Sequence, residues 1–236
     1  MLGVFVAICF GSSKALSGSA NEEWKQVIDA HGTLIQKGQY KQALPLAERA
    51  VVLAESARPI AQTDIASSLE VLAYNYQYLG NHVQALRLHQ RVLSLHEQIF
   101  GAKHENTVTS LNNLANVHSD LGQLSHAMKF RERALGISED INGPDHLITA
   151  EILHGSGMDY TKLGQHEVAL KIKLRVLETR EKIYGVNSLK TALSLNNLAT
   201  TYSYLAQYEK AQPCPMRYEP ERRPVFPSRN EPEAAI

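Results

Sequence analysis

Copies of a 42-residue pattern fill most of this 236-residue chain. Glycine recurs at Gly38, Gly80, Gly122 and Gly164, and Ala206 takes the next place in the series. Two further series keep the same register: Ala43, Ala85, Ala127, Ala169 and Ala211, and Ala50, Val92, Ala134 and Val176. Self-similarity at such a period is typical of repeat proteins, in which each unit packs mainly on its neighbours. The period therefore predicts a solenoid of about four and a half units.

The spacing inside each unit predicts a pair of helices. In the third unit, Leu111, Leu114 and His118 stand at positions i, i+3 and i+7, which lie on one face of a helix. The small residue Ala115 lets a second helix approach closely, and Gly122 supplies the left-handed turn between the two. The same spacing recurs in Leu69-x-x-Leu72-Ala73-x-x-Tyr76 and in Leu195-x-x-Leu198-Ala199-x-x-Tyr202. The predicted fold class is all-α.

This spacing is similar to that of the tetratricopeptide repeat. Segments Leu111–Ala115 and Thr191–Ala199 resemble the long repeats of kinesin light chains and related proteins, and the resemblance covers about residues 22–213. It implies a right-handed superhelical solenoid that binds other proteins.

The repeat register divides the chain into three parts. Residues 1–20 form an apolar and small-residue stretch that ends in Gly18-Ser19-Ala20, which is the layout of a secretory signal peptide. The array covers residues 21–213, with units near 22–59, 64–102, 106–144 and 148–186, and a partial unit at 190–213. The signal peptide predicts export, to the periplasm or out of the cell. If it is not a signal peptide, the chain is expected in the cytoplasm.

The fifth unit is expected to be incomplete. Six prolines lie between residues 213 and 236, and no second helix tolerates them. Residues 214–236 are therefore predicted to be a disordered, Pro-rich tail. The apolar stripe on the first helix of this unit, near Leu195, would then lack its cover. Such an end is expected to be sticky, and self-association through it is one predicted interaction.

The composition argues against several classes of function. Lys plus Arg and Asp plus Glu both number 24, so no net charge attracts the chain to nucleic acid. The apolar run at residues 2–10 is too short to span a membrane. The chain carries no catalytic or nucleotide-binding motif, so neither enzymatic activity nor a cofactor is expected.

The histidines are expected to have structural roles. His82, His89 and His96 step by seven residues, or about 10.5 Å along a helix, which is too far for them to share a metal ion. Packing in or near the core is the favoured interpretation, and no metal site is predicted. His104 and His146 recur in equivalent loops and are expected to be capping or loop residues. Gly155-Ser156-Gly157 replaces the usual core step in the fourth unit and predicts a loosened or kinked helix.

The resemblance implies that the first helix of each unit lines a concave surface. Its non-core positions are the candidate partner-binding residues: Tyr74, Tyr78, Asn112, Asn113, Asn116, His154, Lys162, Asn196, Asn197 and Tyr204. Asparagine both donates and accepts hydrogen bonds, so it can pair with the backbone of an extended peptide, and tyrosine offers a large contact area. The alternative is that these residues are simply solvated positions on a helix.

The predicted function is that of a non-catalytic scaffold or adaptor that holds a partner peptide or protein in the concave groove. Two alternatives stay open: a cargo adaptor of a microtubule motor, as in kinesin light chains, and a fragment of a larger multidomain repeat protein.

Overall fold

The structure is a computed structural model, and it describes residues 18–57 and 61–211. This part of the chain is helical and contains no strand. The helices are α1 (Gly18–Gln36), α2 (Tyr40–Ser56), α3 (Gln62–Tyr78), α4 (His82–Phe100), α5 (Glu105–Asp120), α6 (Leu124–Asn142), α7 (Leu147–Lys162), α8 (His166–Tyr184), α9 (Leu189–Tyr204) and α10 (Tyr208–Ala211).

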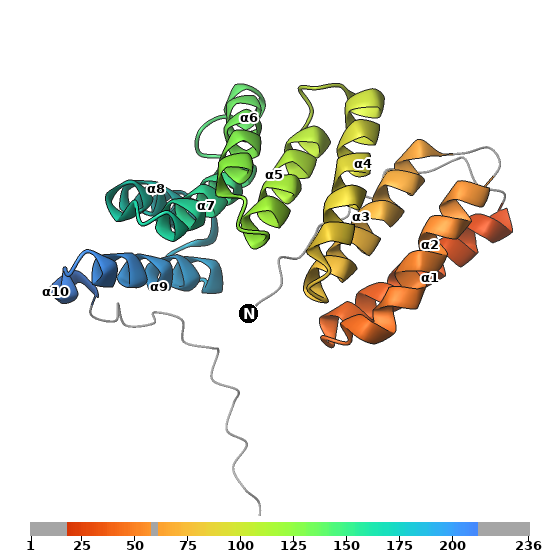
Figure 1. Ribbon diagram of the computed structural model, residues 1–236, viewed down its shortest axis with the longest axis horizontal. Coiled ribbons are helices and arrows are strands. Elements are labelled where there is room, and N and C mark those ends of the chain that lie inside the picture. The colour runs from red at the N-terminus through yellow and green to blue at the C-terminus, as the bar shows by residue number, and fades with distance from the viewer. Residues whose placement is uncertain (1–17, 58–60, 212–236) are drawn as a thin grey trace, which may run out of the picture.

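Consecutive helices pack side by side as antiparallel pairs and build a curved solenoid (Figure 1). We call the first helix of each pair (α1, α3, α5, α7, α9) an A helix and the second a B helix. The A helices α5 and α7 lie on the inside of the curve and contact each other directly, whereas α6 and α8 lie on its outside. The side of the array formed by the A helices is called the inner face below. The prediction of an all-α tetratricopeptide-type solenoid is confirmed.

The turns between paired helices have the left-handed backbone that the glycine series predicts. Gly122 has a φ of 73°, and Ala206, which takes the same place in the fifth unit, has a φ of 55°. Ala206 is the one residue other than glycine with a positive φ among the described residues. Its β-carbon makes this backbone unfavourable by about 1–2 kcal/mol. The fifth unit therefore closes its turn less favourably than the others do.

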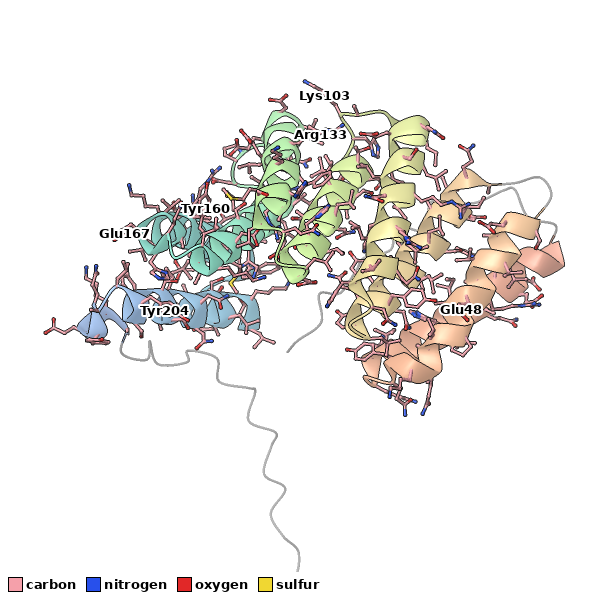
Figure 2. The ribbon with its side chains drawn as sticks, viewed as in Figure 1. Glu48, Lys103, Arg133, Tyr160, Glu167 and Tyr204 are labelled. Carbon is pink, nitrogen blue, oxygen red and sulfur yellow. The ribbon has the colours of Figure 1, made fainter. Side chains whose placement is uncertain are left out.

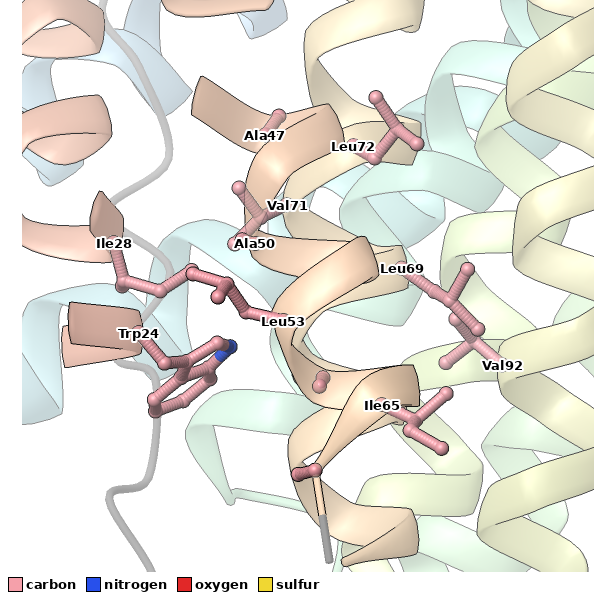
Figure 3. Packing of buried hydrophobic residues seen from close by; sticks show 12 residues of the cluster. Trp24, Ile28, Ala47, Ala50, Leu53, Ile65, Leu69, Val71, Leu72 and Val92 are labelled. Carbon is pink, nitrogen blue, oxygen red and sulfur yellow. The ribbon is translucent and has the colours of Figure 1, made fainter. Parts of the chain in front are cut away.

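Small and large apolar side chains alternate in the core between the first two units (Figure 3). Ala47 and Ala50 on α2 belong to one cluster of buried side chains with Ile28, Leu53 and Leu69, and Leu69 points toward Val92. Trp24 closes this layer, and its Nε1 donates to the buried Oγ of Ser68 at 2.8 Å. The indole is thus buried without leaving its N–H unpaired, as a buried tryptophan requires.

Ion pairs repeat with the same period along the outer side of the B helices. Arginine guanidinium groups pair with a glutamate of the preceding B helix in Arg91–Glu55, Arg133–Glu97 and Arg175–Glu139, at 2.7, 2.6 and 2.7 Å. Arg133 lies beside α6 on the side of α4, which carries its partner Glu97 (Figure 2). These pairs are substantially exposed, so each contributes at most about 1 kcal/mol.

The two loop histidines cap helices, as predicted. The Nδ1 of His104 accepts from the backbone N–H of Asn106 at 3.1 Å, and the Nδ1 of His146 accepts from that of Ile148 at 3.3 Å. Each thereby satisfies one of the unpaired N–H groups at the start of α5 or α7.

The structure covers the repeat array and little of the two predicted terminal segments. Most of the predicted signal peptide and the tail at 214–236 lie outside the described residues, and export stays a prediction. Gly18–Ala20, the predicted end of the signal peptide, form the start of α1. None of the described helices is long and apolar enough to cross a membrane. The helix expected to be kinked at Gly155–Gly157 is one uninterrupted helix, α7.

Candidate functional site

The ten candidate residues differ in how far they are exposed to solvent. Tyr78, Lys162, Asn196 and Tyr204 are exposed, whereas Tyr74, Asn112, Asn116, His154 and Asn197 are half-buried. Asn113 is buried. Whether any of them contacts a partner stays a prediction, but their surroundings differ in ways that matter for binding.

Asn113 points into the protein rather than out of it, so the expectation of an outward-facing side chain is corrected. Its Oδ1 accepts from the hydroxyl of Tyr74 at 2.8 Å, which joins α3 to α5. Its Nδ2 is buried and has no hydrogen-bond partner in the described part of the chain. Neighbouring helix positions are about 100° apart around the axis. Asn113 therefore faces the core although Asn112 does not.

Arg131 holds the other two candidate asparagines of α5, Asn112 and Asn116. This buried arginine projects from α6, and its Nη1 donates to Oδ1 of Asn112 at 2.7 Å. Its Nη2 donates to Oδ1 of Asn116 at 2.9 Å. A guanidinium has only donors, so the side-chain oxygen of each amide must face it and each NH₂ group must face away. This chemistry settles the orientation of both amides.

The two outward NH₂ groups have no protein partner among the described residues. Asn112 and Asn116 are both half-exposed and stand one helical turn apart on α5. They present two amide donors whose positions are fixed from behind by one rigid side chain. The inner face of the third unit thus offers donors to a ligand that carries acceptors.

Asp159 completes the anchorage of Arg131. Its Oδ2 accepts from Nε of Arg131 at 2.7 Å, and its Oδ1 accepts from Oγ of Ser119 at 2.5 Å. The exposed Lys162 donates from Nζ to the same Ser119 Oγ at 2.6 Å. Gly155 provides the space for the guanidinium, because a β-carbon at that position would overlap Arg131.

The neighbouring fourth unit contains more buried positive than negative charge. Lys173 is buried and its Nζ donates to the hydroxyls of Thr161 and Thr201 at 2.9 and 2.8 Å, without a carboxylate. Arg180 is also buried and pairs with Glu151 at 3.1 Å. Burial, and then the positive charge of Arg180, lower the pKa of His154 to about 4. His154 is therefore a neutral imidazole at pH 7, beside cations that favour acceptor or anionic groups.

The second unit has the opposite character. Glu70 occupies the place on α3 that Asn112, His154 and Asn196 occupy on the later A helices, and it is half-buried. Burial raises the pKa of its carboxyl to about 7. One turn further along α3, burial and the nearby Glu70 raise the pKa of Tyr74 well above its usual value.

Aromatic side chains lie at the edge of the inner face. Tyr78 stacks on Tyr40 at a centroid distance of 4.5 Å, and Tyr204 stacks on His166 at 4.7 Å. Tyr78 nevertheless keeps 46% and Tyr204 60% of its surface exposed. One face of each ring is thus used by the protein, and the rest can contact a partner.

The histidines of α4 pack as expected. His89 and His96 are buried and His82 is half-buried. The ring of His89 meets that of Tyr74 edge to face at 5.4 Å. Within residues 18–57 and 61–211, no three His, Cys, Asp or Glu side chains are placed to hold a metal ion.

Sequence comparison gives the family. The tetratricopeptide-repeat family profile matches residues 64–140 and 148–214, which is more than half of the chain. The chain is a tetratricopeptide-repeat protein. No curated protein shows a significant sequence match to it.

Solved tetratricopeptide structures share its fold at low sequence identity. BtubC (BKLC) from P. vanneervenii is 17% identical, with a TM-score of 0.68 over 92% of this chain and 95% of that protein. A putative kinesin light chain from Podosopora anserina is 21% identical, with a TM-score of 0.63 over 82% and 90%. The Rap conjugation gene regulator of plasmid pLS20, in complex with the Phr* peptide, is 17% identical, with a TM-score of 0.70 over 86% and 57%.

Sequence reasoning missed Arg131 and Asp159. The repeat register nevertheless places a charged residue, Arg131, at a position that is buried in each of the first four units. Arg131 follows Ala47 and His89 in the repeat and precedes Lys173, all at one buried position of the B helices. A cation at a core position demands a partner. The search for that partner would have led to Asp159, one period before Thr201 and one after Val117.

Proposed function

We propose that this tetratricopeptide array is a non-catalytic interaction scaffold that binds an extended peptide segment of a partner protein on its inner face. The observation that carries the proposal is the fixation of Asn112 and Asn116 by Arg131, which leaves the NH₂ group of each without a partner in the described part of the chain. A bound backbone would supply the carbonyl oxygens that these donors lack.

The spacing of the two donors suits an extended chain. Residues four apart in a helix are separated by about 6 Å along its axis. Carbonyl groups on one edge of an extended chain recur every second residue, or about 6.6–6.8 Å. A segment lying alongside α5 can therefore accept from Asn112 and Asn116 with two alternate carbonyls. Preorganised donors bind more tightly because little rotamer freedom is lost on binding.

The charge of the next unit supports the same ligand. Lys173 and Arg180 are buried, and only Arg180 has a carboxylate partner in the described part of the chain. Their field favours the negative end of peptide carbonyls or an acidic side chain. Binding of a peptide by a related fold also agrees with it, since the Rap regulator was solved with the Phr* peptide.

Two narrower roles are compatible with this proposal. The similarity to a putative kinesin light chain agrees with a cargo-adaptor function, and the chain spans 57% of the Rap regulator, as a repeat portion of a longer protein would. Either role would use the same inner face to hold its partner.

The test uses peptides selected from a random 12-residue phage library on the full chain, with their affinity measured by fluorescence anisotropy. Asn112→Asp and Asn116→Asp keep the oxygen that Arg131 binds and replace the outward NH₂ by an acceptor. We expect each to weaken peptide binding by about 1–3 kcal/mol, or roughly 5- to 150-fold.

The matched control is Gln98→Glu, which makes the same change from amide to acid on the exposed side of α4. It should leave peptide affinity unchanged. If the two asparagine variants bind as well as the wild type, or if the control loses as much affinity as they do, the proposed binding face is wrong.

A further inference from the structure

The carboxyl group of Glu70 on the inner face has no partner in the described part of the chain. No hydrogen bond or ion pair reaches it from any residue in the described ranges, and it is half-buried on α3. Carboxylates removed from water are nearly always paired, because the lost hydration must be replaced. Residues 18–57 and 61–211 do not supply the replacement.

The fold does not need a carboxylate at this position. The equivalent positions on the following A helices carry neutral side chains, in Asn112, His154 and Asn196. Among the described residues no cation accounts for it, and burial raises the pKa of its carboxyl to about 7. Tyr74, one turn along α3, lies close enough to Glu70 for the carboxylate to raise the pKa of its phenol.

The neighbours of Glu70 are suited to a long cationic side chain. Tyr74 lies one turn along the same helix, and the ring of Tyr78 lies one turn beyond that with nearly half of its surface exposed. A carboxylate beside aromatic rings pairs with the head group of lysine or arginine while the rings contact its methylene stem. No basic side chain of the described residues takes this place.

We propose that Glu70 is the specificity-determining residue of the inner face and binds a lysine or arginine side chain of the partner peptide. This inference rests on the proposed function, because it names the chemistry of the same ligand. The bound segment would place its basic residue at the second unit and its backbone carbonyls at Asn112 and Asn116 in the third. Buried cations of the fourth unit would repel a basic residue there, which favours its placement at the second unit.

The experiment is a double-mutant cycle between Glu70→Gln and the basic residue of a selected peptide. Arginine is replaced by citrulline, its neutral isostere, and lysine by norleucine. We expect the selected peptides to share a basic residue, and its replacement to weaken binding to the wild type by about tenfold or more. Against Glu70→Gln the same replacement should have almost no effect.

Glu132→Gln serves as the control, since Glu132 is an exposed glutamate on α6. It should leave both the affinity and its dependence on the basic residue unchanged. Equal losses against the wild type and Glu70→Gln would overturn the role of Glu70. If binding still depends on Asn112 and Asn116 in that case, the proposed function stands and only this inference fails.

A second measurement requires no selected peptide. Titration of the Glu70 carboxyl by NMR in the presence of N-acetyl-arginine amide should give a lower pKa than in its absence, because a bound cation stabilises the ionised form. N-acetyl-citrulline amide should leave the pKa unchanged. An equal response to both compounds, or a response to neither at tens of millimolar, would contradict the proposal.

Discussion

The Nε of Arg131 on α6 donates to Oδ2 of Asp159 on α7 at 2.7 Å, and the two side chains are 4% and 0% exposed. Both partners are otherwise hydrogen-bonded, to two asparagine amides and to Ser119. This buried pair joins the third unit to the fourth and fixes the donors on which the proposed binding face depends. Stability and binding are therefore linked through one side chain.

Removal of one partner of this pair should be strongly destabilising. Asp159→Ala leaves a buried guanidinium without its counter-charge, which lowers the free energy of unfolding by about 3–5 kcal/mol. Arg133→Ala, two residues from Arg131 on the outer side, breaks an exposed pair and should change it by less than about 1 kcal/mol. Urea denaturation followed by circular dichroism measures both. Similar values for the two variants would contradict the central place given to Asp159.

Two glycines within helices should respond to alanine in opposite directions. Gly136 lies in α6 with open space around it, so Gly136→Ala should stabilise the protein by about 0.5–1 kcal/mol. Gly155→Ala gains the same helix propensity, but its β-carbon displaces the guanidinium of Arg131. We expect it to be destabilising by at least about 1 kcal/mol and to weaken peptide binding. Thermal unfolding distinguishes the two, and stabilisation by both would show that Arg131 can move without penalty.

The buried histidine of α4 predicts a loss of stability in mild acid. Burial lowers the pKa of His89 to about 4, and neither ring nitrogen has a partner in the described part of the chain. Between pH 6.5 and 4 the unfolded chain binds a proton at this histidine and the folded chain does not. The free energy of unfolding therefore falls as pH falls through this window, by up to about 1.4 kcal/mol per pH unit.

His89→Leu should remove this contribution. The difference in unfolding free energy between variant and wild type should be constant above about pH 7 and should shift in favour of the variant as pH falls to 4. A difference that does not vary with pH would mean that the pKa of His89 is the same in the folded and unfolded states.

Hydrogen exchange should be uneven along the array. Leu111 and Ala115 on α5 are fully buried, whereas their counterparts Leu195 and Ala199 on α9 are half-buried, and α10 has only four residues. Since stability in a solenoid is a sum over units and interfaces, α9 should open more easily than α5. Amides of residues 195–205 should exchange faster than those of 111–121. Equal rates would show that the end of the array is covered, and self-association through it would lose its basis.

The periodic features of the fold were predictable because the repeat fixes them. The left-handed backbone of Ala206 followed from its place in the glycine series, and the capping by His104 and His146 followed from their equivalent loops. The non-periodic features were not. Asn113 and Asn112 are identical neighbours in the sequence, and only the packing of Tyr74 on one and Arg131 on the other separates them.

The environment of Gly155 was likewise not predictable from the sequence. Its residue type suggested a weak point in α7, whereas the structure shows a space that the arginine of another helix fills. Which long side chain occupies a gap depends on contacts across units, and the pattern within one unit does not contain this information.

The central claim is that the amide donors of Asn112 and Asn116 contact the bound peptide. The most direct measurement is a two-dimensional ¹H–¹⁵N NMR titration of the full chain with a selected peptide, following the side-chain NH₂ signals of all asparagines. The account predicts that the signals of Asn112 and Asn116 shift downfield as donors to carbonyl oxygens, while that of Asn142 at the end of α6 does not move. Peptide binding that leaves the Asn112 and Asn116 signals unshifted and perturbs the B helices instead would contradict it.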